Sequence, residues 1–280
     1  MLKRGVLSIL RAERLLTSSL RALPDFVVIG GQRCGTTFFY NQITRHPAVK
    51  RAFSKEVHFF DKAYRRGAGW YRSNFPLRLE RRAVARLRGG PALTGEASPY
   101  YIFHPHAARR AAGLVPRAAI IALLRDPVHR AYSHYHHEVR LGAETLSFPR
   151  ALEAEEGRLA GEEERMLGDE TYVSFNHQHF SYVARGRYAE QLERWFAFFR
   201  RERVLVLSSE DFYADPPGVM ATALEFLGLP GERPEPRRRD NEGRYAGLDP
   251  GLRRELAQRF DADNRKLYAL LGRDLGWESG

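Results

Sequence analysis

The stretch VVIGGQRCGTTFFY, residues 27–40, combines an apolar run, a glycine-rich turn and the beginning of a helix. With Asp25 and Phe26 before it, the apolar run predicts a short buried strand over residues 25–30. A glycine-rich turn between a strand and a helix exposes backbone N–H groups, and the helix dipole adds partial positive charge. The stretch therefore predicts a binding loop for phosphate or sulfate, although a tight turn that binds nothing would share the pattern.

The side chains of this loop differ from those of an ATP or GTP loop. The Gly-Lys-Ser/Thr ending, whose hydroxyl ordinarily binds Mg²⁺, is missing. Arg33 stands before the last glycine, Gly35, and its guanidinium can donate two parallel hydrogen bonds to an anion. Thr36 and Thr37 add hydroxyl groups, and Gly31 and Gly35 permit a close approach of the ligand.

Further apolar runs alternate with helical patterns along the chain. Strands are predicted over residues 91–98, 118–124 and 203–212, and helices over 36–46, after Asp126-Pro127, after Pro216-Pro217 and over 249–271. This alternation predicts an α/β fold, namely a P-loop-like three-layer fold with a central, mostly parallel β-sheet flanked by helices. Residues 143–175 predict an exposed helical insertion, and residues 230–247 predict a mobile loop.

A second polar segment, LLRDPVHRAYSHY, occupies residues 123–135. Arg125 stands at the carboxyl end of a predicted strand, which is where open α/β sheets bind ligands. Ser133 follows about two helical turns later. This arginine and this hydroxyl could hold a second phosphate, but Arg125 alone could equally belong to a structural ion pair.

A third polar segment, KEVHFFD, occupies residues 55–61. As a strand or extended loop it would place Lys55, Val57 and Phe59 on one side, with Glu56 and His58 on the other. Both Glu56 and His58 are candidate proton acceptors. An edge segment that carries only a salt bridge is the alternative interpretation.

The composition favours an anionic partner. The net charge is +11, from 45 Lys and Arg against 34 acidic residues, which suits a nucleotide, an acidic polysaccharide, nucleic acid or a membrane surface. One cysteine, Cys34, permits no internal disulfide, and no apolar stretch is long enough to span a membrane. The cysteine count gives no reason to place the chain in an oxidising compartment, and we expect a cytoplasmic protein, of bacterial origin. Residues 1–24 predict a basic amphipathic helix that packs on the domain or contacts a membrane or partner.

In this order, the three segments resemble motifs of the sulfotransferases that use 3′-phosphoadenosine 5′-phosphosulfate (PAPS). The resemblance is closest to the carbohydrate branch of the heparan sulfate glucosaminyl sulfotransferases. It covers residues 25–280, which would form the sulfotransferase domain. Additional segments that match in order are GWY (69–71), GEASPYY (95–101), RGRYAEQLERWFAFF (185–199) and NEGRYAGLDP (241–250), the last resembling a loop that closes over the nucleotide.

The resemblance implies direct in-line transfer of a sulfuryl group from PAPS to an acceptor hydroxyl or amine. The second product would be adenosine 3′,5′-bisphosphate (PAP), and no metal would be required. The acceptor would be a carbohydrate or a glycolipid, and nucleic acid would not be a partner.

The resemblance also implies a role for each matching residue. Glu56 would be the general base, and physical reasoning allows this role, since shielding by Phe59, Phe60 and a bound sugar could raise the pKa of its carboxyl group. Arg33 and His58 would be the other catalytic residues. The residues expected to bind the donor are Gly31, Gln32, Arg33, Cys34, Gly35, Thr36, Thr37, Arg125, Ser133, Gly243 and Arg244, with Arg125 and Ser133 on the 3′-phosphate. The residues expected to bind the acceptor are Lys55, Glu56, His58 and Asp61.

The sequence departs from the heparan sulfate enzymes both outside and within the donor loop. Ala97 stands where those enzymes carry a lysine, the single cysteine permits no late-loop disulfide, and we expect no N-terminal membrane anchor like theirs. Within the donor loop, Arg33 replaces the lysine of that branch. The differences outside the donor loop leave the donor site intact and weaken any claim that the acceptor is heparan sulfate.

Two other classes of protein share part of the pattern. A P-loop kinase or nucleotide hydrolase would depend on Mg²⁺ and a Walker loop, which the sequence lacks. A non-catalytic binder of nucleic acid or acidic glycan would use the basic surface. Such a binder gives no reason for Glu56, His58 and Asp61 to accompany a phosphate loop.

Overall fold

A five-stranded, all-parallel sheet lies at the centre of the computed structural model, which describes residues 2–229 and 247–277, with side chains from residue 8 onward. The strand order is β2-β3-β1-β4-β5. The strands are β1 (Phe26–Gly30), β2 (Val49–Arg51), β3 (Leu93–Ala97), β4 (Ala119–Leu124) and β5 (Val204–Ser208). The predicted α/β fold class is confirmed, whereas the short strand β2 was not predicted.

The burial of strands β1 and β4 shows that both faces of the sheet are covered. Every residue of β1 and of β4 is buried, which is typical of parallel strands between two helical layers. Phe26 of β1 pairs with Gly95 of β3 and with Ala119 of β4. The chain therefore brings the segments that follow β1, β3 and β4 to one edge of the sheet.

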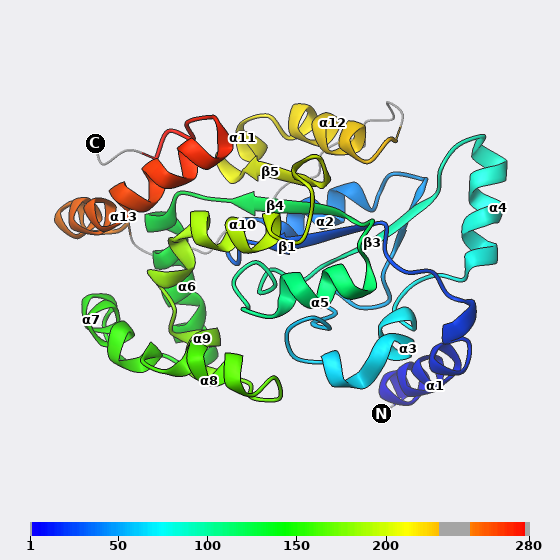
Figure 1. Cartoon of the computed structure of the whole chain (residues 1–280), viewed down its shortest axis with the longest axis horizontal. Helices are drawn as coiled ribbons and strands as arrows, with labels where there is room; N and C mark the ends of the chain where they lie inside the picture. Colours follow the sequence, from blue (N-terminus) through cyan, green and yellow to red (C-terminus); the bar gives the residue numbers. More distant parts are fainter. Residues whose placement is uncertain (1, 230–246, 278–280) are drawn as a thin grey trace.

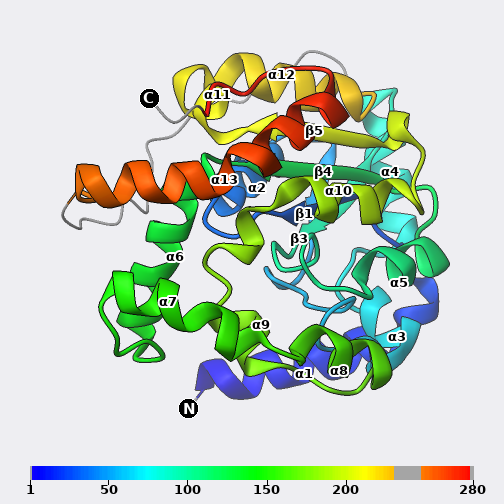
Figure 2. The ribbon, with the colours of Figure 1, turned by 60° about the vertical axis from the view of Figure 1, so that its left-hand side comes forward.

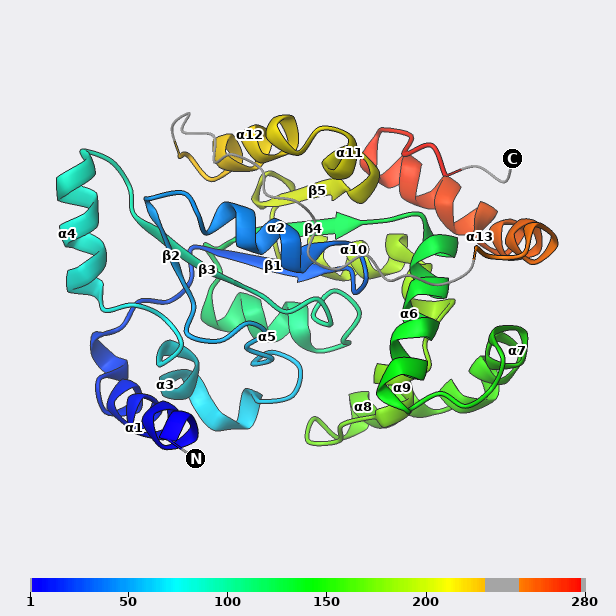
Figure 3. The ribbon, with the colours of Figure 1, turned by 180° about the vertical axis from the view of Figure 1, so that it is seen from behind.

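Helices form a layer on each face of the sheet (Figures 1 and 3). One layer contains α2 (Thr36–Ile43), α11 (Ser209–Ala214) and α12 (Pro216–Phe226), and the other contains α5 (Ala107–Leu114), α10 (Tyr188–Phe196) and α13 (Pro250–Leu271). Phe39 and Phe212 join the apolar cluster of the first layer, and Trp195 joins that of the second. The helix that begins at Thr36 ends at Ile43, three residues earlier than predicted.

The strand predicted over residues 203–212 is wrong in its second half. β5 ends at Ser208, whose hydroxyl accepts a hydrogen bond from the backbone N–H of Asp211 and so caps α11. A serine cap followed by Glu210 and Asp211 in the first turn is a helix-starting signal, and it ends the strand.

A second group of helices extends beyond the carboxyl edge of the sheet (Figures 1 and 2). It comprises α6 (Pro127–Leu141), α7 (Phe148–Leu159), α8 (Glu162–Gly168) and α9 (Phe175–His179). Asp126 caps α6 by accepting hydrogen bonds from the N–H groups of Val128 and His129. The predicted helical insertion at 143–175 is confirmed, but Phe148 and Leu152 are buried against Phe260, so this segment is only partly exposed.

The N-terminal helix α1 (Leu2–Leu16) packs beside α3 (Gly67–Arg72), at the end of the molecule that also carries α4 (Arg78–Arg88) (Figure 1). Arg14 donates hydrogen bonds to the carbonyl oxygens of Ser73 and Phe75, at 2.6 and 2.7 Å. Ile9 and Leu16 stay exposed. Contact with a membrane or partner through this helix therefore stays a prediction, as does the boundary at residue 24.

Four short 3₁₀ helices complete the described elements: Ser18–Leu20, Tyr64–Arg66, Ala184–Gly186 and Arg201–Arg203. Within the described ranges, none of the helices has the length and apolar character that crossing a bilayer requires. The loop predicted over 230–247, with Gly243 and Arg244, lies outside the described residues except for its last position.

Candidate active site

A cavity of about 770 Å³ opens at the carboxyl edge of the sheet. It lies where β1 sits between β3 and β4, the position at which open parallel sheets bind ligands. Its volume is in the range of small-molecule sites. Nine of the predicted site residues line it: Gln32, Arg33, Gly35, Thr36, Thr37, Glu56, His58, Arg125 and Ser133.

The glycine-rich turn gives this cavity the beginning of a helix. Gly35 is the N-cap of α2 and has a φ of 83°, in the left-handed region that favours glycine. A Cβ atom at this position would also lie 2.4 Å from the hydroxyl oxygen of Tyr213. Within the described part of the chain no side chain caps α2, so its first-turn N–H groups remain suited to an anion.

Arg33, Arg125 and Ser133 converge on the same wall of the cavity. The Nε of Arg33 donates a hydrogen bond to Oγ of Ser133 at 3.1 Å, and Arg125 donates to the carbonyl oxygen of Arg33 at 3.3 Å. The hydroxyl of Tyr188 donates to the carbonyl oxygen of Arg125 at 2.8 Å, which fixes the backbone after β4. Two guanidinium groups and a hydroxyl from separate segments thus meet, as an anion site requires.

Residues 55–61 form a loop that ends in a turn at residues 59–61, and we call it the acidic loop. Val57 and Phe59 are buried, and Glu56 and His58 reach the cavity as predicted. The predicted side for Lys55 is wrong, because its Nζ lies 3.3 Å from Glu56 and donates to the hydroxyl of Thr37 at 2.9 Å. The attraction between this ammonium group and the carboxylate of Glu56 holds Lys55 in that position.

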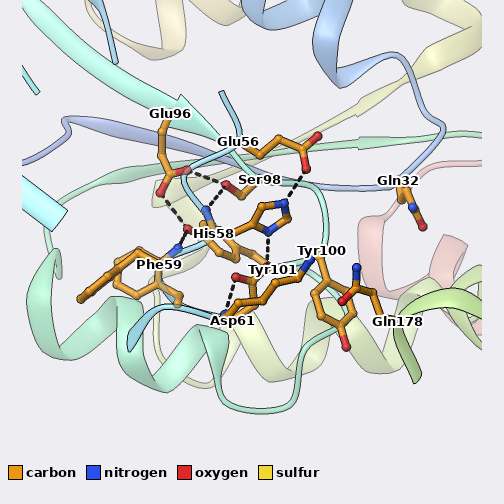
Figure 4. Close-up of polar contacts among 12 residues, drawn as sticks. Gln32, Glu56, His58, Phe59, Asp61, Glu96, Ser98, Tyr100, Tyr101 and Gln178 are labelled. Atoms are coloured by element: carbon orange, nitrogen blue, oxygen red, sulfur yellow. Dashed lines mark hydrogen bonds and ion pairs between the residues drawn. The ribbon is translucent and has the colours of Figure 1, made fainter. Parts of the chain in front are cut away.

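His58 joins the two carboxylates of the acidic loop. Its Nε2 lies 2.9 Å from Oε2 of Glu56, and its Nδ1 lies 2.7 Å from Oδ2 of Asp61 (Figure 4). The side chain of Asp61 is fully buried, whereas those of Glu56 and His58 are partly exposed. The result is a carboxylate–imidazole–carboxylate chain whose outer end is Glu56.

The hydrogen bonds among these three side chains set the protonation states of His58 and Glu56. Burial alone would lower the pKa of His58, but hydrogen bonds to Asp61 and Glu56 raise it to about 9. Burial alone would raise the pKa of Glu56, but the hydrogen bond from His58 and the charge of Lys55 bring it below its ordinary value. At neutral pH an imidazolium therefore faces a carboxylate, and the raised pKa expected for Glu56 beside a bound sugar stays a prediction.

Several predicted residues lie behind the cavity wall. Gly31 donates its N–H to the carbonyl oxygen of Leu123, and Cys34 is fully buried, which raises the pKa of its thiol to about 11. Asp61 reaches the cavity only through His58, and Lys55 is tied to Thr37 and Glu56. Gly243 and Arg244 lie outside the described residues.

The wall also contains residues to which the sequence assigned no role in binding or catalysis, among them Lys62, Tyr100, His137, Glu138, Arg140, Gln178, His179 and Arg185. Arg185 hydrogen-bonds the side chain of Gln32 and donates to the carbonyl oxygen of Gln178 at 2.6 Å, so it links α9 to the donor loop. Arg185 could have been found from the sequence, because it is the first residue of the segment 185–199 that resembles the family. The five-residue helix α9 carries no comparable pattern. Among the described residues, no group of His, Cys, Asp or Glu has the arrangement of a metal site.

A loop suited to an anion lies beside a carboxylate at the carboxyl edge of a parallel sheet, an arrangement that is typical of α/β enzymes of group transfer. The sequence model of the family described as "Sulfotransferase domain" matches residues 23–241. The chain therefore belongs to the sulfotransferase family and is a transferase.

The individual relatives agree with this assignment. Human heparan sulfate glucosamine 3-O-sulfotransferase 6 is 28% identical, over 92% of this chain and 74% of that protein. The membrane-associated sulfotransferase kil1 of Dictyostelium discoideum is also 28% identical, over 93% of this chain and 68% of that protein. The crystal structure of a sulfotransferase from Alicyclobacillus acidocaldarius is 32% identical, covers 91% of this chain and 99% of that one, and superposes with a TM-score of 0.66. The chain lies close to the heparan sulfate branch.

Proposed function

We propose that this sulfotransferase uses PAPS as donor and a hydroxyl or amine of a carbohydrate or glycolipid as acceptor, with Glu56 as general base. The observation that carries the proposal is the meeting of two sets of groups in one cavity. Arg33, Arg125 and Ser133 suit the charges of the donor, and Glu56 with His58 suits the proton transfer.

The donor half of the site supports a nucleotide with two separated anionic groups. The N–H groups at the start of α2 and the guanidinium of Arg33 would bind the phosphosulfate. Arg125 and Ser133 would bind the 3′-phosphate. In this arrangement the charge of Arg33 stabilises the negative charge that grows on the departing phosphate.

The acidic loop supports direct transfer. The bond between sulfur and the phosphate oxygen of the donor breaks as the bond between sulfur and the acceptor oxygen or nitrogen forms. The acceptor proton passes to a carboxylate oxygen of Glu56. His58, held by Asp61 and protonated at neutral pH, cannot accept this proton and instead fixes the position of Glu56.

The acceptor class rests on the names of the relatives and on the charge of the wall. The human relative is a heparan sulfate glucosamine sulfotransferase, and Lys62 and Arg140 add cationic groups to this cavity. Both features suit an acidic sugar, whereas Ala97 differs from the lysine expected for the heparan sulfate enzymes. Cytoplasmic location and bacterial origin stay predictions.

A binding and transfer experiment tests this function. PAPS should bind without Mg²⁺ and more tightly than ATP, and labelled PAPS should sulfate a carbohydrate from a panel of glycans, lipids and peptides followed by mass spectrometry. Sulfation of phenols or peptide tyrosines alone would overturn the carbohydrate acceptor. Mg²⁺-dependent turnover of ATP without sulfuryl transfer would overturn the PAPS-dependent reaction.

The dependence of kcat/KM on pH should show two limbs that belong to the acidic loop. The pKa of Glu56 lies below its ordinary value of 4.5, so its carboxylate stays ionised at pH 4.5. Activity should fall only at a more acidic pH, where Glu56 takes up a proton. Because the pKa of His58 is raised to about 9, the imidazolium persists through neutral pH and is lost above pH 9.

The His58→Asn variant, which cannot ionise, should therefore lose the alkaline limb at about pH 9 while keeping the acidic one. The measurement is kcat/KM at saturating donor from pH 4 to pH 10 for both proteins. An alkaline limb that persists in His58→Asn would assign it to another group.

A further inference from the structure

A carboxyl group that the proposed chemistry does not use lies below the acidic loop. Glu96 belongs to β3, is paired with Val27 of β1 and has no exposed surface. Its Oε1 accepts hydrogen bonds from the hydroxyls of Tyr71 and Tyr101 at 2.9 and 3.0 Å, and its Oε2 accepts one from Ser98 at 2.7 Å. Burial raises the pKa of Glu96 to about 7, against these hydrogen bonds, which lower it.

Two of the three hydroxyls also hold the backbone of the acidic loop. Oγ of Ser98 accepts the N–H of His58 at 3.1 Å, and the hydroxyl oxygen of Tyr101 accepts the N–H of Phe59 at 2.7 Å (Figure 4). A hydroxyl has a single hydrogen, so donating it to Glu96 turns the oxygen lone pairs toward these N–H groups. Two consecutive amides of the loop are thereby connected to one buried carboxylate.

We propose that Glu96 is a positioning residue for the acidic loop and acts on Glu56 through Ser98, Tyr101 and the backbone of His58. This inference rests on the proposed role of Glu56 as general base. Glu96 does not line the cavity. It fixes the position of the His58 backbone, and thereby the position of the imidazole that hydrogen-bonds Glu56.

The distances explain why this anchoring matters. A general base has to lie within about 2.6–3.2 Å of the atom whose proton it accepts. The side chain of His58 holds Glu56 at 2.9 Å, so a shift of the His58 backbone is passed to the carboxylate. A displacement of about 1 Å in a catalytic group can lower a rate by about 10²-fold, so partial loss of one anchor should be measurable.

Two tyrosines give a matched pair of variants. Tyr71 and Tyr101 are both fully buried, and both donate to the same oxygen of Glu96. Only the hydroxyl of Tyr101 also accepts an N–H group of the acidic loop. Tyr101→Phe and Tyr71→Phe therefore remove the same atom and the same bond to Glu96, but only the first releases the loop.

Tyr101→Phe should lower kcat about fivefold, the effect of losing one hydrogen bond of ordinary strength. It should leave the KM for PAPS and the affinity for PAP unchanged. Tyr71→Phe should lower kcat much less, with a loss of thermal stability similar to that of Tyr101→Phe. Equal values of kcat for the two variants, or a parallel loss of PAP affinity, would overturn the proposal.

Hydrogen–deuterium exchange gives a readout that needs no activity. Peptides that contain residues 55–61 should exchange faster in Tyr101→Phe and in Glu96→Gln than in Tyr71→Phe, because a glutamine cannot accept hydrogen bonds from all three hydroxyls. If exchange follows this order but the unmodified protein transfers no sulfate, the proposed function fails while the anchoring stands. If the three variants exchange alike, the positioning role is overturned whatever the activity.

Discussion

Glu56→Gln should lower the turnover number by about 10²–10⁴-fold, the range that general-base catalysis contributes. Glutamine keeps the size of the side chain and can still hydrogen-bond His58, but it cannot accept a proton. Affinity for PAP should stay nearly unchanged, because Glu56 is not proposed to contact the nucleotide. Steady-state kinetics with PAPS and calorimetric titration with PAP measure the two quantities.

His58→Asn is the comparison that separates the two candidate bases. It removes the imidazolium but leaves the carboxylate of Glu56, so it should reduce turnover by less than Glu56→Gln. The opposite order, with turnover abolished by His58→Asn and largely kept by Glu56→Gln, would make His58 the base. Full activity in both variants would mean that the acidic loop is not the catalytic element.

Arg125→Ala should weaken PAP binding by about ten- to a hundredfold, while the affinity for AMP changes little. The loss of a charge-assisted hydrogen bond to the 3′-phosphate costs about 1.5–3 kcal/mol, which corresponds to this factor. AMP lacks the 3′-phosphate and therefore gains nothing from Arg125. Calorimetric titration of both nucleotides gives the ratio directly.

Arg140→Ala is the matched control for charge. Arg140 lines the same cavity but is not proposed to bind the 3′-phosphate. Its removal should alter the affinities for PAP and AMP by similar factors, whereas Arg125→Ala should alter their ratio. If the unmodified protein binds PAP and AMP equally, the assignment of Arg125 and Ser133 to the 3′-phosphate is wrong.

The fold could be predicted because its decisive signals are local. β1 and β4 are continuous apolar runs, and each is followed by a turn and a helix. The cavity could be predicted for the same reason, since Arg33 and Arg125 follow strands whose carboxyl ends must meet in a parallel sheet. Sequence position alone then specifies which side chains come together.

The parts that escaped prediction depend on contacts between distant segments. Lys55 turns toward Glu56 because Thr37, from another segment, accepts its hydrogen bond. Gln178 enters the wall because the buried Arg185 holds its carbonyl oxygen. The anchoring of the acidic loop to Glu96 likewise joins residues that show no periodic pattern.

The central place of β1 also determines when the glycine-rich loop that follows it can form. β1 pairs on one side with β3 and on the other with β4, which ends at Leu124. A ribosome makes the chain from its N-terminus, so β1 emerges before either of its neighbours exists. Until β3 and β4 have been synthesised, the five residues of β1 have no strand with which to pair. Pairing between strands that are far apart in the sequence is also slow. This segment, which we propose binds the donor, is thus exposed to aggregation during synthesis, and slower production or chaperones should raise the yield of folded protein.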